Sequence, residues 1–311
     1  MSNILLWVGF NLFIIGLLTL DLVVFNRKPH EISIAEALKW SSVWIGIAML
    51  FNVGVYYWYG HISALQFLTG FLIEKSLSVD NLFVFLLIFT YFKVPAKYQH
   101  TVLFWGILGA LVMRGTLILL GAALIVRFHW ILYVFGFFLV VTGIRMIFQS
   151  EDVKVHPERN IVVRFFKRLF PVVAGFHDEK FFVKVNGKRY ATLLIVVLIV
   201  VETTDLVFAI DSIPAIFAIT TDPFIIYTSN VFAILGLRSL YFALAGMMDL
   251  FHYLRHGLSV VLVFIGAKML VDSYLRIPIG IALIIVAGVL TLSIIASIAR
   301  TKRHGSPLKK Q

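Results

Sequence analysis

Two short segments of this chain carry the same pattern of acidic residues. Glu74–Asn81 has the sequence EKSLSVDN and Asp205–Ser212 has the sequence DLVFAIDS, so each places two acids six positions apart and a polar residue after the second acid. Both segments lie inside long apolar stretches, where carboxylates are costly and usually functional. Their duplication predicts a polar binding site between two related halves of a membrane protein.

The predicted site offers oxygen ligands. Glu202 lies three positions before Asp205, shares its helix face and adds a further carboxylate. The candidate metal ligands are five acids and one amide: Glu74, Asp80, Asn81, Glu202, Asp205 and Asp211. Carboxylate and amide oxygens suit hard divalent cations such as Mg²⁺, Ca²⁺ and Mn²⁺. The pattern therefore predicts a transported cation, with no bound cofactor and no enzymatic activity.

Sulfur and imidazole are not expected at this site. The chain has no cysteine, which excludes disulfides, thiolate metal sites and thiol catalysis, and its nine histidines fall in connections or at span ends. Several of the acids should hold protons when the site is empty, because like charges repel in a low-dielectric cavity, and should release them when metal binds. Exchange of protons for metal is the resulting hypothesis.

Basic residues repeat as well. The segment GALVMRG around Arg114 resembles ILGLRSL around Arg238, and TGIRM aligns with IGAKM, which places Arg145 against Lys268 with an offset of one residue. We expect these four bases to act as counter-charges or in gating.

Each motif-bearing stretch is long enough to require a tilt or a break. Residues six apart on a helix point about 120° apart, so the two acids of a motif meet only if the helix unwinds between them. Pro214 cannot donate a hydrogen bond to the carbonyl of Ile210, which predicts a helix break beside Asp211.

The composition places these motifs in an integral membrane protein. Of 311 residues, 60% are hydrophobic and 14% charged, and the mean hydropathy is +0.97. We therefore expect an all-α polytopic fold of about nine transmembrane helices. The nine candidate spans are Ile4–Phe25, Leu38–Tyr59, Ile62–Phe92, Thr101–Val126, Trp130–Phe148, Tyr190–Thr220, Phe224–Leu250, Gly257–Leu275 and Ile277–Ala299.

Charge distribution predicts the orientation. Twenty Lys and Arg residues fall on one side of the nine spans and two on the other, which indicates an outside N-terminus and a cytoplasmic C-terminus. The net charge of +11 is then a topology signal and a basis for contact with anionic lipid, and we expect no nucleic-acid partner. Oligomeric state is left open.

The third to fifth spans repeat as the sixth to eighth, and because three is odd the second copy must be inverted in the membrane. The expected organisation is two N-terminal spans (1–61), a first repeat (62–148), a basic cytoplasmic loop (149–189), a second repeat (190–275), and a last span with a basic cytoplasmic tail (276–311). The loop could fold as a cap at the membrane surface or remain a solvated connection.

The motif segments resemble the TerC family of bacterial membrane proteins. The likeness is carried by EKSLSVDNLFVF from Glu74, VETTDLVFAIDSIPAIFAITTDPF from Val201, SNVFAILGLRSLYF from Ser229 and VFIGAKML from Val263. It is strongest to the alkali-inducible, Alx-like branch. The resemblance implies a role in metal-ion homeostasis in the bacterial inner membrane, with export of Mn²⁺ as the expected activity and the six acidic and amide positions as its site.

Other functions stay open. An accessory membrane protein for metal homeostasis, tellurite resistance, or assembly and metallation of membrane proteins would use the acids structurally, and some relatives are tied to calcium or to membrane-protein insertion. An intramembrane aspartyl protease is disfavoured, because its expected Gly-x-Gly-Asp motif is missing and the acids outnumber a catalytic dyad.

Overall fold

The computed structural model describes most of the chain. The described residues are 2–25, 34–128, 130–148, 160–173, 175–177, 179–185, 187–245, 253–272, 274–275 and 277–304. Part of the predicted basic loop (149–159) and the end of the predicted basic tail (305–311) lie outside them. The side chain of Asp80 also lies outside the description, although its backbone is helical.

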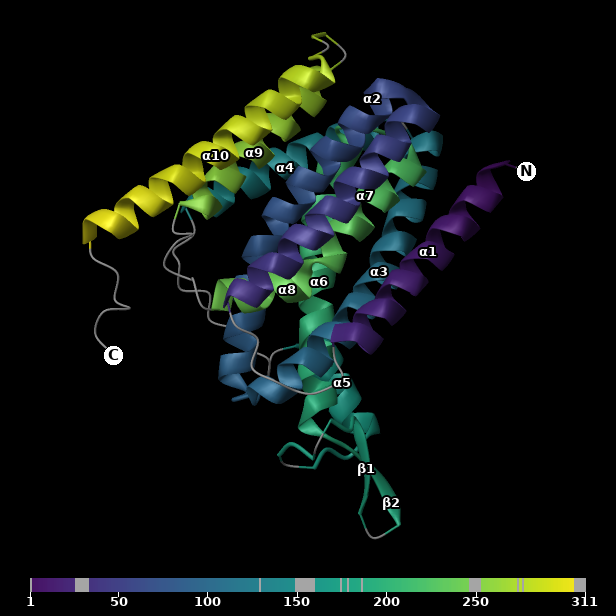
Figure 1. The fold of residues 1–311 in the computed structure, drawn as a ribbon, viewed down its shortest axis with the longest axis vertical. Helices are drawn as coiled ribbons and strands as arrows, with labels where there is room; N and C mark the ends of the chain where they lie inside the picture. Colours follow the sequence, from purple (N-terminus) through teal and green to yellow (C-terminus); the bar gives the residue numbers. More distant parts are fainter. Residues whose placement is uncertain are drawn as a thin grey trace.

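Long apolar helices make up the body of the protein (Figure 1). They are α1 (Ser2–Phe25), α2 (Ile34–Tyr91), α3 (Ala96–Arg127), α4 (Ile131–Phe148), α6 (Leu193–Phe217), α7 (Pro223–Leu235), α8 (Leu237–Ala245), α9 (Leu254–Val271) and α10 (Ile279–His304). Among the described residues, α3, α4, α6, α9 and α10 are each long and apolar enough to cross a membrane, and α7 with α8 would make a sixth span with a 41° bend. The all-α, polytopic class predicted from composition is confirmed.

One residue interrupts α2. Gly60 has φ 85° and ψ 173°, which is not helical, and it separates the ranges 34–59 and 61–91. A residue with a side chain would be strained at this φ, so glycine is required for the turn. The two halves occupy the ranges predicted for the second and third spans.

The expected break in α6 does not occur. The helix is continuous from Leu193 to Phe217, and it does not unwind between the two motif acids. It has 25 residues, fewer than the predicted stretch of 31, because Ala191 belongs to a strand and the residues after Phe217 form a turn. Pro214 lies in the last turn of α6, where it removes one hydrogen bond, to the carbonyl of Ile210, without ending the helix.

The helices pack in pairs from different parts of the chain. α4 packs most extensively against α9, α2 against α7 and α8, and α3 against α6. The α4–α9 crossing is backbone to backbone: a Cβ built on Gly266 would lie 2.6 Å from the carbonyl oxygen of Gly136, and one on Gly143 would lie 2.8 Å from that of Ser259. Small residues allow this close approach.

The predicted basic loop contains secondary structure of its own, which the all-α expectation omitted. α5 (Ile161–Leu169) is followed by an antiparallel hairpin of β1 (Phe182–Val185) and β2 (Lys188–Ala191). β2 crosses the boundary expected at 189/190. α5 lies beside the start of α6, and the hairpin extends away from the helices (Figure 1).

Candidate functional site

Arg114 is the centre of a buried cluster of charges. Its Nε and Nη2 donate to the two carboxylate oxygens of Asp205 at 3.0 and 2.9 Å, and its Nη1 donates to Glu74. The same Nη1 lies 3.4 Å from Asn230 Oδ1. Arg114 is 1% exposed and Glu74 is 0% exposed. One guanidinium from α3 thus joins the first acid of each repeated motif, one from α2 and one from α6.

The cluster keeps unused polar atoms. Glu74 Oε2 and Asn230 Nδ2 are buried and, within the described part of the chain, have no hydrogen-bond partner. An unpaired buried carboxylate oxygen is unfavourable and calls for a further ligand. The arrangement can therefore accept a cation in addition to, or in place of, the guanidinium.

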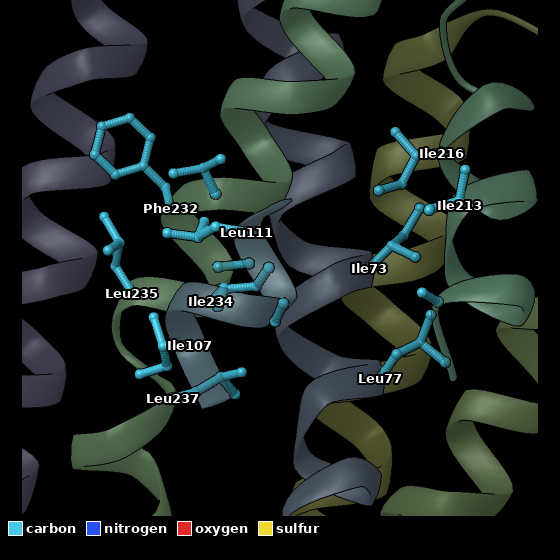
Figure 2. Close-up of a cluster of buried hydrophobic side chains, with 14 of the residues drawn as sticks. Ile73, Leu77, Ile107, Leu111, Ile213, Ile216, Phe232, Ile234, Leu235 and Leu237 are labelled. Carbon is cyan, nitrogen blue, oxygen red and sulfur yellow. The ribbon is translucent and has the colours of Figure 1, made fainter. Parts of the chain in front are cut away.

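Buried apolar side chains form a shell between the helices that carry these charges, and Figure 2 shows part of it. On one side, Ile73 and Leu77 of α2 lie beside Ile213 and Ile216 of α6, within the same buried core. The other labelled members are Ile107, Leu111, Phe232, Ile234, Leu235 and Leu237. Apolar neighbours exclude water, which strengthens every electrostatic interaction inside the shell.

A small cavity adjoins the cluster. Its volume is ≈ 20 Å³, which is sufficient for one ordered water. Residues of α2, α3, α6, α7 and α8 line it: Phe85, Leu103, Gly106, Ile107, Ala110, Val201, Glu202, Asp205, Ile234, Leu237 and Arg238. Its three charged side chains include both acids of the Glu202/Asp205 pair, so the cavity connects to the ion-pair cluster through Asp205.

Glu202 fits against a glycine. A Cβ built on Gly109 of α3 would lie 2.1 Å from Glu202 Oε1 and 2.6 Å from Oε2, so only glycine leaves room for this carboxylate. Glu202 Oε2 is buried and without a hydrogen-bond partner in the described residues. Glu202 is also close enough to Asp205 for the two charges to interact.

Among the described side chains, neither Asn81 nor Asp211 forms a hydrogen bond or an ion pair with this group. Asn81 is buried, at 3% exposure, on α2. Asp211 is half-buried on α6, where the charge of Arg145 acts on it, and Ile210 beside it is half-exposed. No three described His, Asp or Glu side chains are close enough together to hold a metal, and the side chain of Asp80 is not among those described.

The other predicted counter-charges have different partners. Arg238 donates to His100 Nε2 at 2.9 Å, and Lys268 donates to the carbonyl of Ala218 at 3.2 Å. Lys268 also lies 3.7 Å from Asp272. Among the four bases, Arg114 forms ion pairs with the motif acids Glu74 and Asp205.

Three site residues were missed from the sequence. Asn230 is a lone amide in an apolar stretch, and that polarity could have marked it. A single sequence does not mark Gly109 as a site residue, because its role depends on the Glu202 carboxylate that packs against it. Lys75 follows Glu74 in the first motif, and its Nζ donates to the carbonyl of Ala233 on α7 at 3.2 Å.

The family-model comparison matches residues 59–305 to the integral membrane protein TerC family. This range contains both acid motifs, the ion-pair cluster and the cavity. The chain belongs to the TerC family. The resemblance stated from the motifs is confirmed.

Curated relatives of the TerC-family protein match along nearly its whole length. An uncharacterized membrane protein of Myxococcus xanthus is 50% identical over 299 residues, covering 96% of this chain and 93% of its own. A protein of Escherichia coli K12 named "Putative membrane-bound redox modulator Alx" is 46% identical over 310 residues, covering 96% of both chains. The Salmonella typhi protein of the same name is 45% identical over 317 residues, covering 99% of this chain and 98% of its own. No solved structure matches.

Proposed function

We propose that this TerC-family protein is a secondary transporter that exports divalent cations, with Mn²⁺ as the cargo, from the cytoplasm. The observation that carries the proposal is the Arg114 cluster. A buried guanidinium between Glu74 and Asp205 occupies the position that a cation would take between the same oxygens. Carboxylate and amide oxygens also match the ligand preference of Mn²⁺.

In the proposed mechanism, the cargo replaces Arg114 as the partner of the two acids. Glu202 lines the cavity, and because its Oε2 has no partner among the described residues we propose it as the first carboxylate that an entering ion meets. Asp205 lines the same cavity, so the ion next contacts its carboxylate and displaces the guanidinium. The oxygens that lack partners, Glu74 Oε2 and Glu202 Oε2, complete the ligand set.

Alternating access would come from the inverted repeat. We propose nine spans in which the second half of α2 with α3 and α4 corresponds to α6, α7–α8 and α9. The packing supports this correspondence: exchanging the two copies maps the contact of α2 with α7 and α8 onto the contact of α6 with α3, and it maps the α4–α9 contact onto itself. Rocking of one copy against the other would expose the site to each side in turn.

Protons are the proposed counter-ion. Arg114 compensates the charge of Asp205 when no metal is bound, whereas Glu202, which lines the same cavity and interacts with the charge of Asp205, has no basic partner among the described residues. Protonation of Glu202 is therefore the proposed means of compensating its charge when the metal has left. We further propose an inner-membrane location with the N-terminus outside, the C-terminus in the cytoplasm, and anionic lipid at the cytoplasmic face.

Flux from purified protein tests the proposal. Uptake of Mn²⁺, Mg²⁺ and Ca²⁺ into proteoliposomes is measured separately for each ion. The protein should take up Mn²⁺, and this uptake should respond to a pH gradient. The variants Glu202→Gln and Asp205→Asn, at the two acids that line the cavity, should abolish flux while inserting normally. Asp272→Asn, at an exposed carboxylate, should transport as the parent does. Absence of flux from correctly folded parent protein would end the transporter proposal, and flux without dependence on pH would end the proton coupling alone.

An accessory role is the second candidate, because relatives carry the name of a redox modulator. This chain has no cysteine, so thiol redox chemistry would have to come from a partner. That role predicts metal binding by the purified protein without flux.

A further inference from the structure

One face of α5 is apolar and exposed. Ile161, Phe165 and Leu169 recur at every fourth position, so they form a stripe along the helix, and they are 79%, 61% and 59% exposed. The opposite face packs toward α6 through Val163, which is 2% exposed. An apolar stripe of this kind is the surface of a helix that has a partner outside the described chain.

Both ends of α5 are fixed to the rest of the protein. Asn160 caps the helix by accepting from the backbone N–H groups of Val162 and Val163, and its Nδ2 donates to Thr203 Oγ1 on α6 at 2.7 Å. After the helix, the carbonyl of Pro171 accepts from Ala191 N at 3.0 Å. The stripe is therefore held in one orientation.

These two attachments give α5 a direction relative to the membrane-crossing helix. Asn160, at the start of α5, is bonded to Thr203 in the interior of α6. Pro171, just after the end of α5, is bonded to Ala191, just before the first residue of α6. The chain of α5 therefore runs back along α6, from its interior to its start. The first half of α5 is almost entirely apolar, while two of its three bases, Lys167 and Arg168, stand in its last turn. Its sequence contains no acid. The polarity of α5 therefore increases along the helix toward the start of α6, as polarity increases from the acyl chains to the headgroups of a bilayer.

We propose that α5 is an interfacial helix that docks on the anionic phospholipid of the bilayer in which the protein resides. The apolar stripe would contact acyl chains, and Arg164, Lys167 and Arg168 would contact headgroup phosphates. Charge complementarity selects this partner, because three bases without an acid favour an anionic surface. The inference does not depend on which ion is transported.

The absence of native cysteine makes a direct test simple. A polarity-sensitive fluorophore is attached to a single cysteine at Ile161→Cys, at Arg168→Cys or, as a control on the projecting hairpin, at Lys188→Cys. Each labelled full-length protein is reconstituted in vesicles of zwitterionic lipid, with or without anionic lipid. Quenchers are placed in the acyl chains, at the headgroups or in the water.

The proposal expects a depth order. The probe at 161 should be quenched by acyl-chain bromines, the probe at 168 by headgroup quenchers, and the probe at 188 by neither. Replacing Arg164, Lys167 and Arg168 with Gln should lower the ratio of docked to undocked helix in anionic vesicles by roughly fivefold for each base removed.

Two outcomes would overturn it. One is equal access of a water-soluble quencher to positions 161 and 188 in both lipids. The other is shielding of position 161 that rises with protein density and not with anionic lipid, which would assign the stripe to a second copy of the chain. Mn²⁺ flux measured on the same vesicles separates the lipid-docking proposal from the transport proposal. If the probes show the expected depth order but no Mn²⁺ flux is measured, transport alone is refuted.

Discussion

Gly109 is the residue on which the position of the Glu202 carboxylate depends. An added Cβ would lie within 2.6 Å of three atoms of that carboxylate, so Gly109→Ala must move it. We expect Mn²⁺ affinity to fall by about 10-fold or more, which is the usual effect of disturbing a group that positions a metal ligand. Isothermal titration or Mn²⁺-dependent flux would measure the change.

A matched control lies outside the site, on the first half of α2. An added Cβ at Gly46 would meet no atom within 4 Å, so Gly46→Ala should bind Mn²⁺ as the parent does. Equal affinities for the two alanine variants would show that the carboxylate of Glu202 takes no part in binding.

Arg114 should compete with the cargo for Glu74 and Asp205. Removing it in Arg114→Gln leaves two buried acids without a counter-charge and should destabilise the metal-free protein by about 3–5 kcal/mol. Mn²⁺ should then restore stability, so the metal-induced rise in Tm should be larger than in the parent. Thermal unfolding with and without Mn²⁺ tests this.

The exposed base at the end of the same helix provides the comparison. Arg127→Gln should change neither the stability of the metal-free protein nor its response to Mn²⁺. A metal-induced Tm shift in Arg114→Gln no larger than that of Arg127→Gln would argue against competition at the site.

At the scale of elements, the α4–α9 crossing depends on Gly266. A Cβ there would meet the backbone of Gly136 at 2.6 Å and of Val140 at 2.8 Å, and backbone cannot move aside as a flexible side chain can. Gly266→Ala should therefore lower the free energy of unfolding by about 1–3 kcal/mol. Gly288→Ala on α10, with nothing within 4 Å, should be neutral or slightly stabilising, and denaturation in detergent would compare them. Equal losses would mean that the crossing is not limited by backbone contact.

The sequence predicts these elements better than it predicts their contacts. Continuous apolar runs mark the helices, because lipid requires apolar residues on every side. They do not mark where α6 starts, since Tyr190 and Ala191 are apolar enough for a span yet pair in β2. They also hide α5, whose nine residues are too few to span a membrane.

The candidate site could be predicted in its residues and only partly in its geometry. Duplication identified Glu74 and Asp205 as related positions, and it identified Arg114 as related to Arg238. Their ion pairs join residues 40 and 91 positions apart, so they follow from helix packing and rotation, which a single sequence does not specify. For the same reason, the half-buried position of Asp211 beside Arg145 could not be foreseen.

At the scale of the whole molecule, the proposed topology places the hairpin and the α9–α10 connection on opposite sides of the membrane. Lys188 lies on the hairpin, and Tyr274, between α9 and α10, is 94% exposed. In intact cells, a membrane-impermeant thiol reagent should label Tyr274→Cys and spare Lys188→Cys, because only the former faces outward. Labelling of both positions, or of Lys188→Cys alone, would contradict the orientation.

The glycine turn at position 60 affects where proteases can cleave the protein. A straight helix of 58 residues would extend about 87 Å, far beyond one bilayer, so α2 must turn within its length. The turn is made by a single residue, and it therefore leaves no unstructured segment that a protease could bind in extended form. Digestion of the intact protein should therefore spare this junction and begin at the β-hairpin, whose exposed tip near Gly187 projects from the bundle. The two halves of α2 would remain covalently joined in every early fragment.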